Sequence, residues 1–144
     1  MQLTPFHLAV QVRDIDEARD FYGIGMGFSE GRSTENWIDF NMFGHQFVTH
    51  LNPQISKTGK IATISNLVDG HGVPVPHFGV VMNFEDWEAF TKKISLIIDD
   101  FIIEPYVRFK GKPGEQGTMF FSDPSGNVLE FKAFRNIDLD LFAK

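Results

Sequence analysis

The feature that most constrains this chain is an internal repeat of one structural plan. Residues 6–12 alternate apolar with small or polar side chains, which predicts a half-buried strand, and residues 77–83 repeat this pattern. Each segment carries a histidine, His7 or His77, followed two positions later by a small residue. A helix and three further strands are predicted after each segment. The chain is therefore predicted to contain an internal repeat of about 55–60 residues, with the order strand–helix–three strands in both copies.

The two helices are predicted from their first turns and their apolar stripes. Asp14 is a suitable N-cap for the first helix, and Glu85 and Asp86 favour the positive end of the second. Apolar residues then recur at helical spacing, which predicts that one face of each helix is buried. These residues are Ile15, Ala18 and Tyr22 in the first helix and Trp87, Phe90, Ile94 and Ile97 in the second.

The repeat also sets the predicted boundaries. The first module covers about residues 5–51 and the second about residues 76–134, with a connector at 52–75 and a tail at 135–144. A connector of this length often forms a lid or a wall of a binding site. The remaining strands are predicted near residues 28–31, 36–42 and 45–51 in the first module and 101–109, 118–122 and 127–134 in the second.

Composition excludes several classes of function. The chain has 13 basic and 19 acidic residues, a net charge of -6, and no basic cluster, which argues against nucleic-acid and anionic membrane surfaces. It contains no cysteine, so disulfides, thiolate catalysis and cysteine-ligated metals are excluded.

No apolar run is long enough to cross a bilayer, and no signal peptide is visible, so a cytoplasmic location is expected. The 16 Phe residues predict an aromatic core that continues into an apolar pocket.

Three side chains stand out as candidate metal ligands. Because side chains alternate along a strand, His7, His77 and Glu130 are each predicted to lie on the face opposite an apolar one. Two imidazoles and a carboxylate on one concave surface are costly unless they are solvated or bound to something. Two histidines and one carboxylate are the ligand set that leaves metal positions open for a substrate and oxygen. The alternative is that these residues bind no metal, because a single histidine on a strand is more often a structural residue and a lone glutamate is more often solvated.

Three segments resemble the vicinal-oxygen-chelate superfamily: HLAVQVRDIDEARDFY, PHFGVV and FFSDPSGNVLEFKAF. That superfamily includes glyoxalase I, bleomycin-resistance proteins and type I extradiol dioxygenases, and the resemblance covers residues 5–134. Three further segments are similar to a group described as predicted dioxygenases of the extradiol type. These are WIDFNMFGHQFVTHL, DGHGVPVPHFGVV and FIIEPYVRFKGKPGEQGTMFF.

The resemblance implies an α+β fold, in which two βαβββ modules form a curled mixed sheet around a metal cleft. It also implies that His7, His77 and Glu130 bind one divalent metal. Glyoxalase I has a fourth protein ligand, and alignment of Gly44 with Gly126 places Val48 at that position, although Gln46 is close by. Valine cannot bind a metal, so the three-ligand arrangement of the extradiol enzymes is expected.

Further side chains are candidates for work beside the metal. His50 lies two residues beyond Val48, so strand alternation predicts that it faces the site, where it is the candidate acid or base. Tyr106 and Arg108 share one face of their strand, where they are candidates for orienting oxygen and gripping a substrate anion. A solvated hairpin histidine, a half-buried tyrosine and a surface arginine are the respective alternatives. His45 and His71 lie in turn or loop contexts, and no catalytic role is predicted for them.

The function expected from the resemblance is that of an Fe(II)-dependent dioxygenase acting on a small catechol-like substrate, with Mn, Zn, Ni or Co as other possible metals. Two alternatives remain open. One is a glyoxalase- or epimerase-like lyase or isomerase, and the other is a non-catalytic binding module of the resistance type. The expected partners are a small-molecule substrate and a second copy of the chain in a homodimer.

Overall fold

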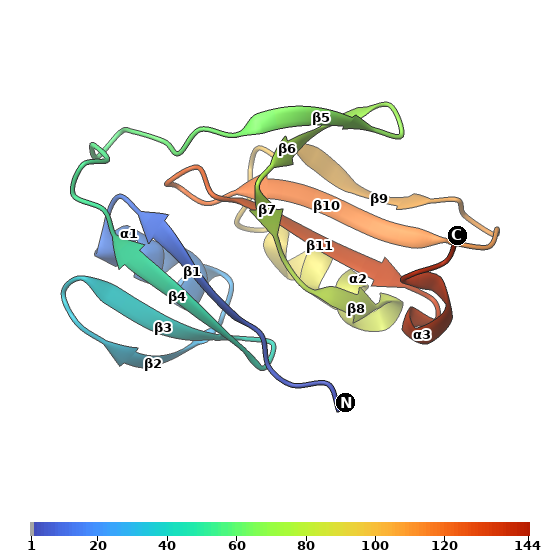
Figure 1. The fold of residues 1–144 in the computed structure, drawn as a ribbon, viewed down its shortest axis with the longest axis horizontal. Coiled ribbons are helices and arrows are strands. Elements are labelled where there is room, and N and C mark those ends of the chain that lie inside the picture. Colours follow the sequence, from blue (N-terminus) through green and yellow to red (C-terminus); the bar gives the residue numbers. More distant parts are fainter. Residues whose placement is uncertain (1) are drawn as a thin grey trace. The chain divides into compact units, whose positions relative to one another are not determined.

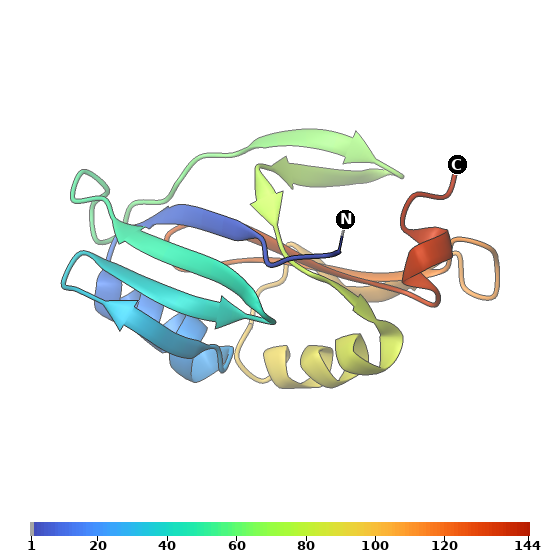
Figure 2. The same ribbon diagram turned by 60° about the horizontal axis from the view of Figure 1, so that its bottom comes forward.

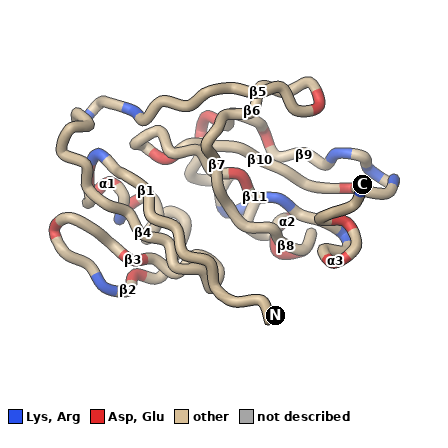
Figure 3. The backbone as a smooth tube through the Cα atoms, viewed as in Figure 1, with Lys and Arg blue, Asp and Glu red and all other residues tan. Residues whose placement is uncertain are grey.

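The computed structural model describes residues 2–144, which divide into two compact units. The first unit runs to Ala62 and also includes Asp123–Asn127, and the second consists of Thr63–Ser122 and Val128–Lys144. Each unit combines helix with β-sheet, which confirms the predicted α+β class (Figure 1). Basic and acidic residues are interspersed along the chain in both units (Figure 3). Within residues 2–144 no helix is both long and apolar enough to span a bilayer.

The first unit is a four-stranded sheet with helical turns packed against it. Its elements are β1 (His7–Val12), α1 (Ile15–Ala18), the π-helical segment Arg19–Gly25, β2 (Ser29–Ser33), β3 (Trp37–Met42) and β4 (His45–Leu51). The strand order is β1-β4-β3-β2. Strand β1 runs parallel to β4, whereas β4, β3 and β2 are antiparallel neighbours. The first predicted module is thus one strand, a helical segment and three strands, as its pattern indicated.

The helical segment is held by its cap and by aromatic packing. A carboxylate oxygen of Asp14 accepts a hydrogen bond from the backbone N–H of Glu17 at 2.8 Å, which confirms the predicted N-cap. The Tyr22 ring lies 4.8 Å from that of Phe47, centroid to centroid, in an edge-on contact that favours dense packing. The predicted buried residues of this helical face, Ile15, Ala18 and Tyr22, are all buried.

The second unit contains the larger sheet and an additional hairpin. Its elements are β5 (Ile64–Val68), β6 (His71–Val75), β7 (His77–Phe78), β8 (Val81–Asn83), α2 (Phe84–Ile94), β9 (Ile103–Arg108), β10 (Gln116–Ser122), β11 (Val128–Phe134) and α3 (Ile137–Asp140). The main sheet has the order β7-β11-β10-β9, and β8 also pairs with β11. Strands β7 and β8 run parallel to β11, and β9, β10 and β11 are antiparallel neighbours.

Helix α2 covers one face of this sheet (Figure 2). Its N-cap is Asn83, whose side-chain oxygen accepts from the backbone N–H of Asp86 at 2.8 Å. The indole Nε1 of Trp87 donates to the carbonyl oxygen of Phe131 at 2.9 Å, so this buried polar group is satisfied. The buried apolar residues of the helix are Phe84, Trp87, Phe90 and Ile94.

The β5–β6 hairpin lies on the face of the sheet opposite α2 (Figure 2). It occupies much of the segment 52–75, for which the sequence predicted only a connector. The hairpin turns at Asp69 and Gly70, both of which have positive φ, at 48° and 83°. This is the geometry of a tight two-residue turn, for which Asp-Gly is a strong sequence signal.

Two residues predicted for the core are on the surface, and one predicted strand is divided. Phe6 is 66% exposed because it precedes the first paired residue of β1. Ile97 is 39% exposed because α2 ends at Ile94 and its buried stripe ends there too. The predicted strand 77–83 is interrupted between β7 and β8, next to Gly79.

Candidate functional site

The second unit brings two of the three predicted metal ligands together. Nε2 of His77 lies 3.1 Å from Oε2 of Glu130, and both side chains are largely buried, with 28% and 12% of their surface exposed. His77 is on β7, and the parallel pairing of β7 with β11 places it beside Val128, two residues before Glu130. Gly79 allows this approach, because a Cβ there would lie 1.6 Å from the carbonyl oxygen of Glu130.

A hydrogen bond on the other ring nitrogen fixes the orientation of His77. Nδ1 lies 2.6 Å from the carbonyl oxygen of Pro74. Because a carbonyl only accepts, Nδ1 must carry the hydrogen, and Nε2 is the atom directed toward Glu130. A lone pair on Nε2 and a carboxylate oxygen at this distance would repel each other, so a proton or a cation is required beside them. A backbone carbonyl on the second nitrogen is the usual support of a metal-bound histidine.

The two oxygens of Glu130 have different surroundings. Oε1 accepts a hydrogen bond from the Thr118 hydroxyl at 2.8 Å and lies 3.6 Å from Nζ of Lys132. Oε2 is the oxygen that faces His77. The carboxylate is therefore oriented by one hydrogen bond and one ion pair at Oε1, and it presents Oε2 to His77.

The His77–Glu130 pair fits two adjacent positions around a divalent metal. Two ligand atoms each about 2.1 Å from one ion and at right angles to each other are about 3 Å apart. The observed separation of 3.1 Å between Nε2 and Oε2 agrees with that value. Among residues 2–144, however, no group of three or more His, Asp or Glu side chains is close enough to hold an ion. The pair therefore fits a metal as two ligands, and further ligands must complete the coordination.

Both side chains line a cavity of about 240 Å³ that is formed by the second unit alone. One part of its wall is apolar and is formed by Val73, Phe120 and Ile103, which pack together with Val128 in a small hydrophobic cluster. The Phe120 ring also packs edge-on against His77, with centroids 5.0 Å apart. The polar and ionisable side chains lining the cavity are His71, His77, Tyr106, Arg108, Thr118, Glu130 and Lys132.

Tyr106 and Arg108, which alternation predicted to share a face, thus both lie in the wall of the cavity that contains His77 and Glu130. His71, for which no role was predicted, also lines it, and its ring centroid is 5.5 Å from that of Tyr106. A signal for His71 was present in the sequence. It precedes His77 by six residues, an even spacing, and it follows directly after the Asp69-Gly70 turn.

The third predicted ligand, His7, belongs to the first unit. Its Nδ1 lies 2.7 Å from Oε1 of Gln46, the residue beside it on β4. The next pair on the same face is Ala9 with Val48. In the second unit, the residue two positions after the strand histidine, Gly79, lies against Glu130. In the first unit, the residue at the same position, Ala9, pairs with Val48. Val48 is therefore the counterpart of Glu130, and the first unit has no carboxylate at that position.

His50 is separated from His7 within the first unit. The register pairs His7 with Gln46 and Gln11 with His50, so His50 lies four residues farther along β4. At 3.3 Å per residue this is about 13 Å, well beyond direct hydrogen-bonding distance of the His7 imidazole. Strand alternation placed His50 on the same face as His7, but the register does not bring the two side chains together. His45 instead accepts a hydrogen bond from the backbone N–H of Phe6 at 2.8 Å.

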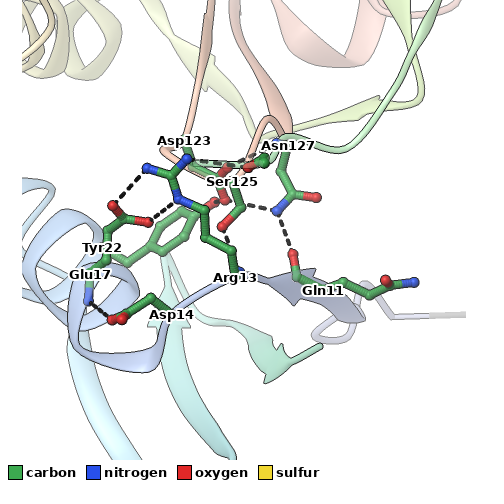
Figure 4. A network of polar contacts seen from close by, with 9 residues as sticks. Gln11, Arg13, Asp14, Glu17, Tyr22, Asp123, Ser125 and Asn127 are labelled. Atoms are coloured by element: carbon green, nitrogen blue, oxygen red, sulfur yellow. Dashed lines mark hydrogen bonds and ion pairs between the residues drawn. The ribbon is translucent and has the colours of Figure 1, made fainter. Parts of the chain in front are cut away.

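The turn that precedes the last strand has a structural role in the first unit (Figure 4). Asp123 accepts hydrogen bonds from the hydroxyl of the buried Tyr22 at 2.7 Å and from the side chain of Asn127 at 2.8 Å. Ser125 accepts from the backbone N–H of Arg13 at 2.9 Å, and Asn127 donates to the carbonyl oxygen of Gln11 at 2.7 Å. The D-P-S-G-N sequence therefore fastens the turn to β1 and to the helical segment.

Burial dominates the electrostatics of this turn. It raises the pKa of the Asp123 carboxyl above its ordinary value, and the hydrogen bonds from Asn127 and Tyr22 oppose that rise. Burial, followed by the nearby charge of Asp123, raises the pKa of the Tyr22 hydroxyl well above its ordinary value. Tyr22 is therefore a permanent donor to a carboxylate that is costly to bury.

A family model described as the Glyoxalase/Bleomycin resistance protein/Dioxygenase superfamily matches residues 4–131. The crystal structure of a glyoxalase/bleomycin resistance protein/dioxygenase from Alicyclobacillus acidocaldarius is 30% identical in sequence, covers 93% of each chain and has a TM-score of 0.72. The fosfomycin resistance protein FosX from Listeria monocytogenes is 14% identical, with a TM-score of 0.61 over 93% of this chain and 95% of its own. A lactoylglutathione lyase from Agrobacterium tumefaciens is 18% identical, with a TM-score of 0.59 over 93% and 96%. The comparison with curated protein sequences gives no match.

Proposed function

This chain belongs to the glyoxalase/bleomycin resistance protein/dioxygenase superfamily, and we propose that it is a metal-dependent oxygenase that opens the ring of a small catechol-like substrate. In the proposal, His77 and Glu130 of the second unit and His7 of the first bind one Fe(II) ion. His7 comes either from the same chain or from a second copy in a homodimer. Members of the superfamily are often metal-dependent enzymes, although some act in resistance.

The observation that carries the proposal is the way in which His77 and Glu130 are held. A backbone carbonyl on Nδ1 and a hydroxyl on Oε1 direct the remaining nitrogen and oxygen toward each other at 3.1 Å. This arrangement uses the supporting contacts typical of metal ligands and opens onto a cavity of about 240 Å³. A cavity of that size suits a single-ring substrate rather than a large one.

The ligand set favours an oxygenase over a four-ligand lyase. Val48 stands where a second carboxylate would complete a four-ligand site. Two histidines and one carboxylate leave positions free for two substrate oxygens and for O₂. When bound, iron would supply a template that holds both reactants side by side and transfers electron density between them.

The residues of the cavity wall have separate tasks in this proposal. His71 accepts the proton that a substrate hydroxyl releases on binding, because an imidazole exchanges protons near neutral pH. Tyr106, whose ring lies 5.5 Å from that of His71, orients an oxygen atom by hydrogen bonding. Phe120 and Val73 exclude water from the face of the ring. His50, on β4 of the first unit, stays a second candidate for proton transfer.

A second function is supported by Gln46. This residue lies directly beside His7, and its side-chain oxygen is 2.7 Å from Nδ1 of the imidazole. An amide oxygen can bind Zn, Mn or Co, so Gln46 could serve as a fourth ligand in a lyase or isomerase that polarises a carbonyl. In that case the chemistry would need no oxygen.

Oxygen consumption separates the two functions. The protein is reconstituted anaerobically with Fe(II), then mixed with catechol or 4-methylcatechol in an oxygen electrode. We expect one O₂ to be consumed per catechol, with both oxygen atoms retained in the ring-opened product and no added reductant. A zinc-loaded sample is the matched control and should consume none. Full iron occupancy without oxygen uptake on any catechol would reject the oxygenase, and turnover of an α-ketoaldehyde hemithioacetal by the zinc form would support the lyase.

A further inference from the structure

The cavity of the second unit has two cationic side chains: Lys132, which forms an ion pair with Glu130, and Arg108, which lies farther along the sheet. Strand register places Glu130 beside Phe120, and Lys132 beside Thr118, which in turn pairs with Tyr106. Each step of two residues along a strand is about 6.8 Å. The cavity is therefore ordered from a ligand-binding end, through a row with Lys132, to a further row.

Arg108 occupies that further row, where it pairs with Gln116. Its side chain is only 14% exposed, so its charge is poorly solvated and needs a partner. The partner is Asp69, from the turn of the β5–β6 hairpin, and this carboxylate is 57% exposed. The guanidinium of Arg108 is thus largely buried, whereas the carboxylate that neutralises it, that of Asp69, is mostly exposed to solvent.

The charges at this end differ from those of the chain as a whole. The protein carries a net charge of -6, yet both Lys132 and Arg108 line a small cavity. Glu130 is the one carboxylate of the lining, and its two oxygens are engaged by Thr118 and Lys132 on one side and by His77 on the other. Lys132 is already paired with Glu130, whereas an anionic ligand in the cavity would meet Arg108, whose partner Asp69 is mostly exposed.

We propose that the substrate carries an acidic group that takes the place of Asp69 on Arg108, so that Arg108 confers a preference for acidic over neutral substrates and Asp69 limits that preference. This inference rests on the proposed function, because it requires vicinal oxygens at one end of the substrate and an acid at the other. A carboxylate is the best match, since the guanidinium fork accepts it in a bidentate manner. Asp69 is then an internal competitor for the arginine that the substrate uses.

The competition makes a specific prediction about binding. An acidic substrate exchanges one carboxylate for another on Arg108, so the interaction with Asp69 must be broken before binding is complete. Removal of the Asp69 charge should therefore tighten binding of an acid and leave a neutral catechol unaffected. Removal of the Arg108 charge should abolish both the preference for the acid and the effect of Asp69.

Calorimetry on the zinc-loaded protein tests this without turnover. The probes are 3,4-dihydroxybenzoate and 4-methylcatechol, which differ in a carboxylate against a methyl group. We expect the acid to bind at least about 10-fold more tightly, Asp69→Asn to tighten it a further 3- to 10-fold or so, and Arg108→Gln to remove the preference. In the double variant the gain from Asp69→Asn should disappear. Arg135→Gln, which breaks an exposed ion pair with Glu115 at 2.9 Å, is the matched control and should change neither affinity.

The outcomes separate the inference from the function on which it rests. Equal affinity for both probes, or an equal effect of Asp69→Asn on both, would overturn the acidic substrate and leave the oxygenase in place. If zinc is bound but neither probe binds, the catechol-binding function fails and the inference fails with it. Circular dichroism of each variant ensures that a loss of binding is not a loss of fold.

Discussion

The two units repeat one plan but use the face opposite the helix differently. In the second unit, that face presents His77 and Glu130 with donors and a carbonyl that hold them in place, and a hairpin stands over it. In the first unit, the corresponding positions hold His7, beside the neutral amide of Gln46, and Val48. In the first unit, the buried polar contacts are instead those of the turn that contains Asp123, which accepts a hydrogen bond from Tyr22. A duplicated module can thus assign orientation of ligands to one copy and structural stability to the other.

The largest effect should come from removal of His77, the proposed metal ligand with the better supporting contacts. His77→Ala should lower metal affinity by at least about 100-fold, because loss of a ligand exceeds the effect of losing its supporting contacts. Titration of the apo protein with Fe(II) or Zn(II) measures this. His45→Ala is the control from the first unit, because His45 only accepts from a backbone N–H. Stoichiometric metal in His77→Ala would remove His77 from the ligand set.

The next largest effect tests the structural role of the Asp123 turn in the first unit. Tyr22→Phe should lower the free energy of unfolding by about 1–3 kcal/mol, because it deprives the buried Asp123 carboxylate of a donor. Tyr106→Phe is the matched control, since that tyrosine lines the cavity, and should cost little stability. Metal affinity should be unchanged in Tyr22→Phe. A stability loss in Tyr106→Phe equal to that in Tyr22→Phe would argue against the contrast between the units.

The same variant has a predictable pH dependence. Burial raises the pKa of Asp123 in the folded state, so its ionisation opposes folding: the penalty is absent below the unfolded-state pKa and complete above the folded-state pKa. Tyr22→Phe removes a hydrogen bond that lowers this pKa, and the penalty should grow. Denaturant unfolding should therefore show a smaller difference from the parent at pH 4.5 than at pH 7.5. A difference that grows toward low pH would assign the effect to another group.

Sequence reasoning reached the parts of this molecule that depend on local rules. Alternation placed Glu130 opposite the fully buried Leu129 and Phe131, and capping rules identified Asp14 as the start of a helix. Both results need only strand periodicity or a single turn of backbone. The α+β class followed from the same patterns.

The parts that were missed depend on contacts between distant segments. The distance of His50 from His7 also depends on a long-range feature, the register of β1 on β4, which periodicity does not fix; the role of His50 stays a prediction. The break at Gly79 arises because that strand approaches the Glu130 backbone. The β5–β6 hairpin was missed because its strands are short and lack strong apolar alternation, although Asp69-Gly70 was visible. The place of His71 in the cavity wall was missed for the same reason, because His71 belongs to that hairpin.

Two buried threonines allow a finer test of the comparison. Thr118, in the second unit, donates to Oε1 of Glu130 at 2.8 Å and is 3% exposed. Thr118→Val should weaken metal binding by about 10-fold, because the carboxylate loses a contact that orients it. Isothermal titration with zinc measures the change, and thermal unfolding confirms the fold. Unaltered zinc affinity would mean that Lys132 alone orients Glu130.

The smallest effect is expected from the buried threonine of the first unit, Thr49. Thr49 is fully buried, yet its hydroxyl is the one buried side-chain polar atom within residues 2–144 that has no hydrogen-bond partner. Its neighbours on the adjacent strands, Val10 and Ile38, are apolar, so the hydroxyl was desolvated without compensation. Thr49→Val keeps the shape and removes the uncompensated group, and should raise the free energy of unfolding by about 0.5–1.5 kcal/mol with metal binding unchanged. Because the same substitution at Thr118 should affect the ligand instead, opposite outcomes at two threonines would separate the roles of the two units. Destabilisation by Thr49→Val would show that an ordered water satisfies the hydroxyl.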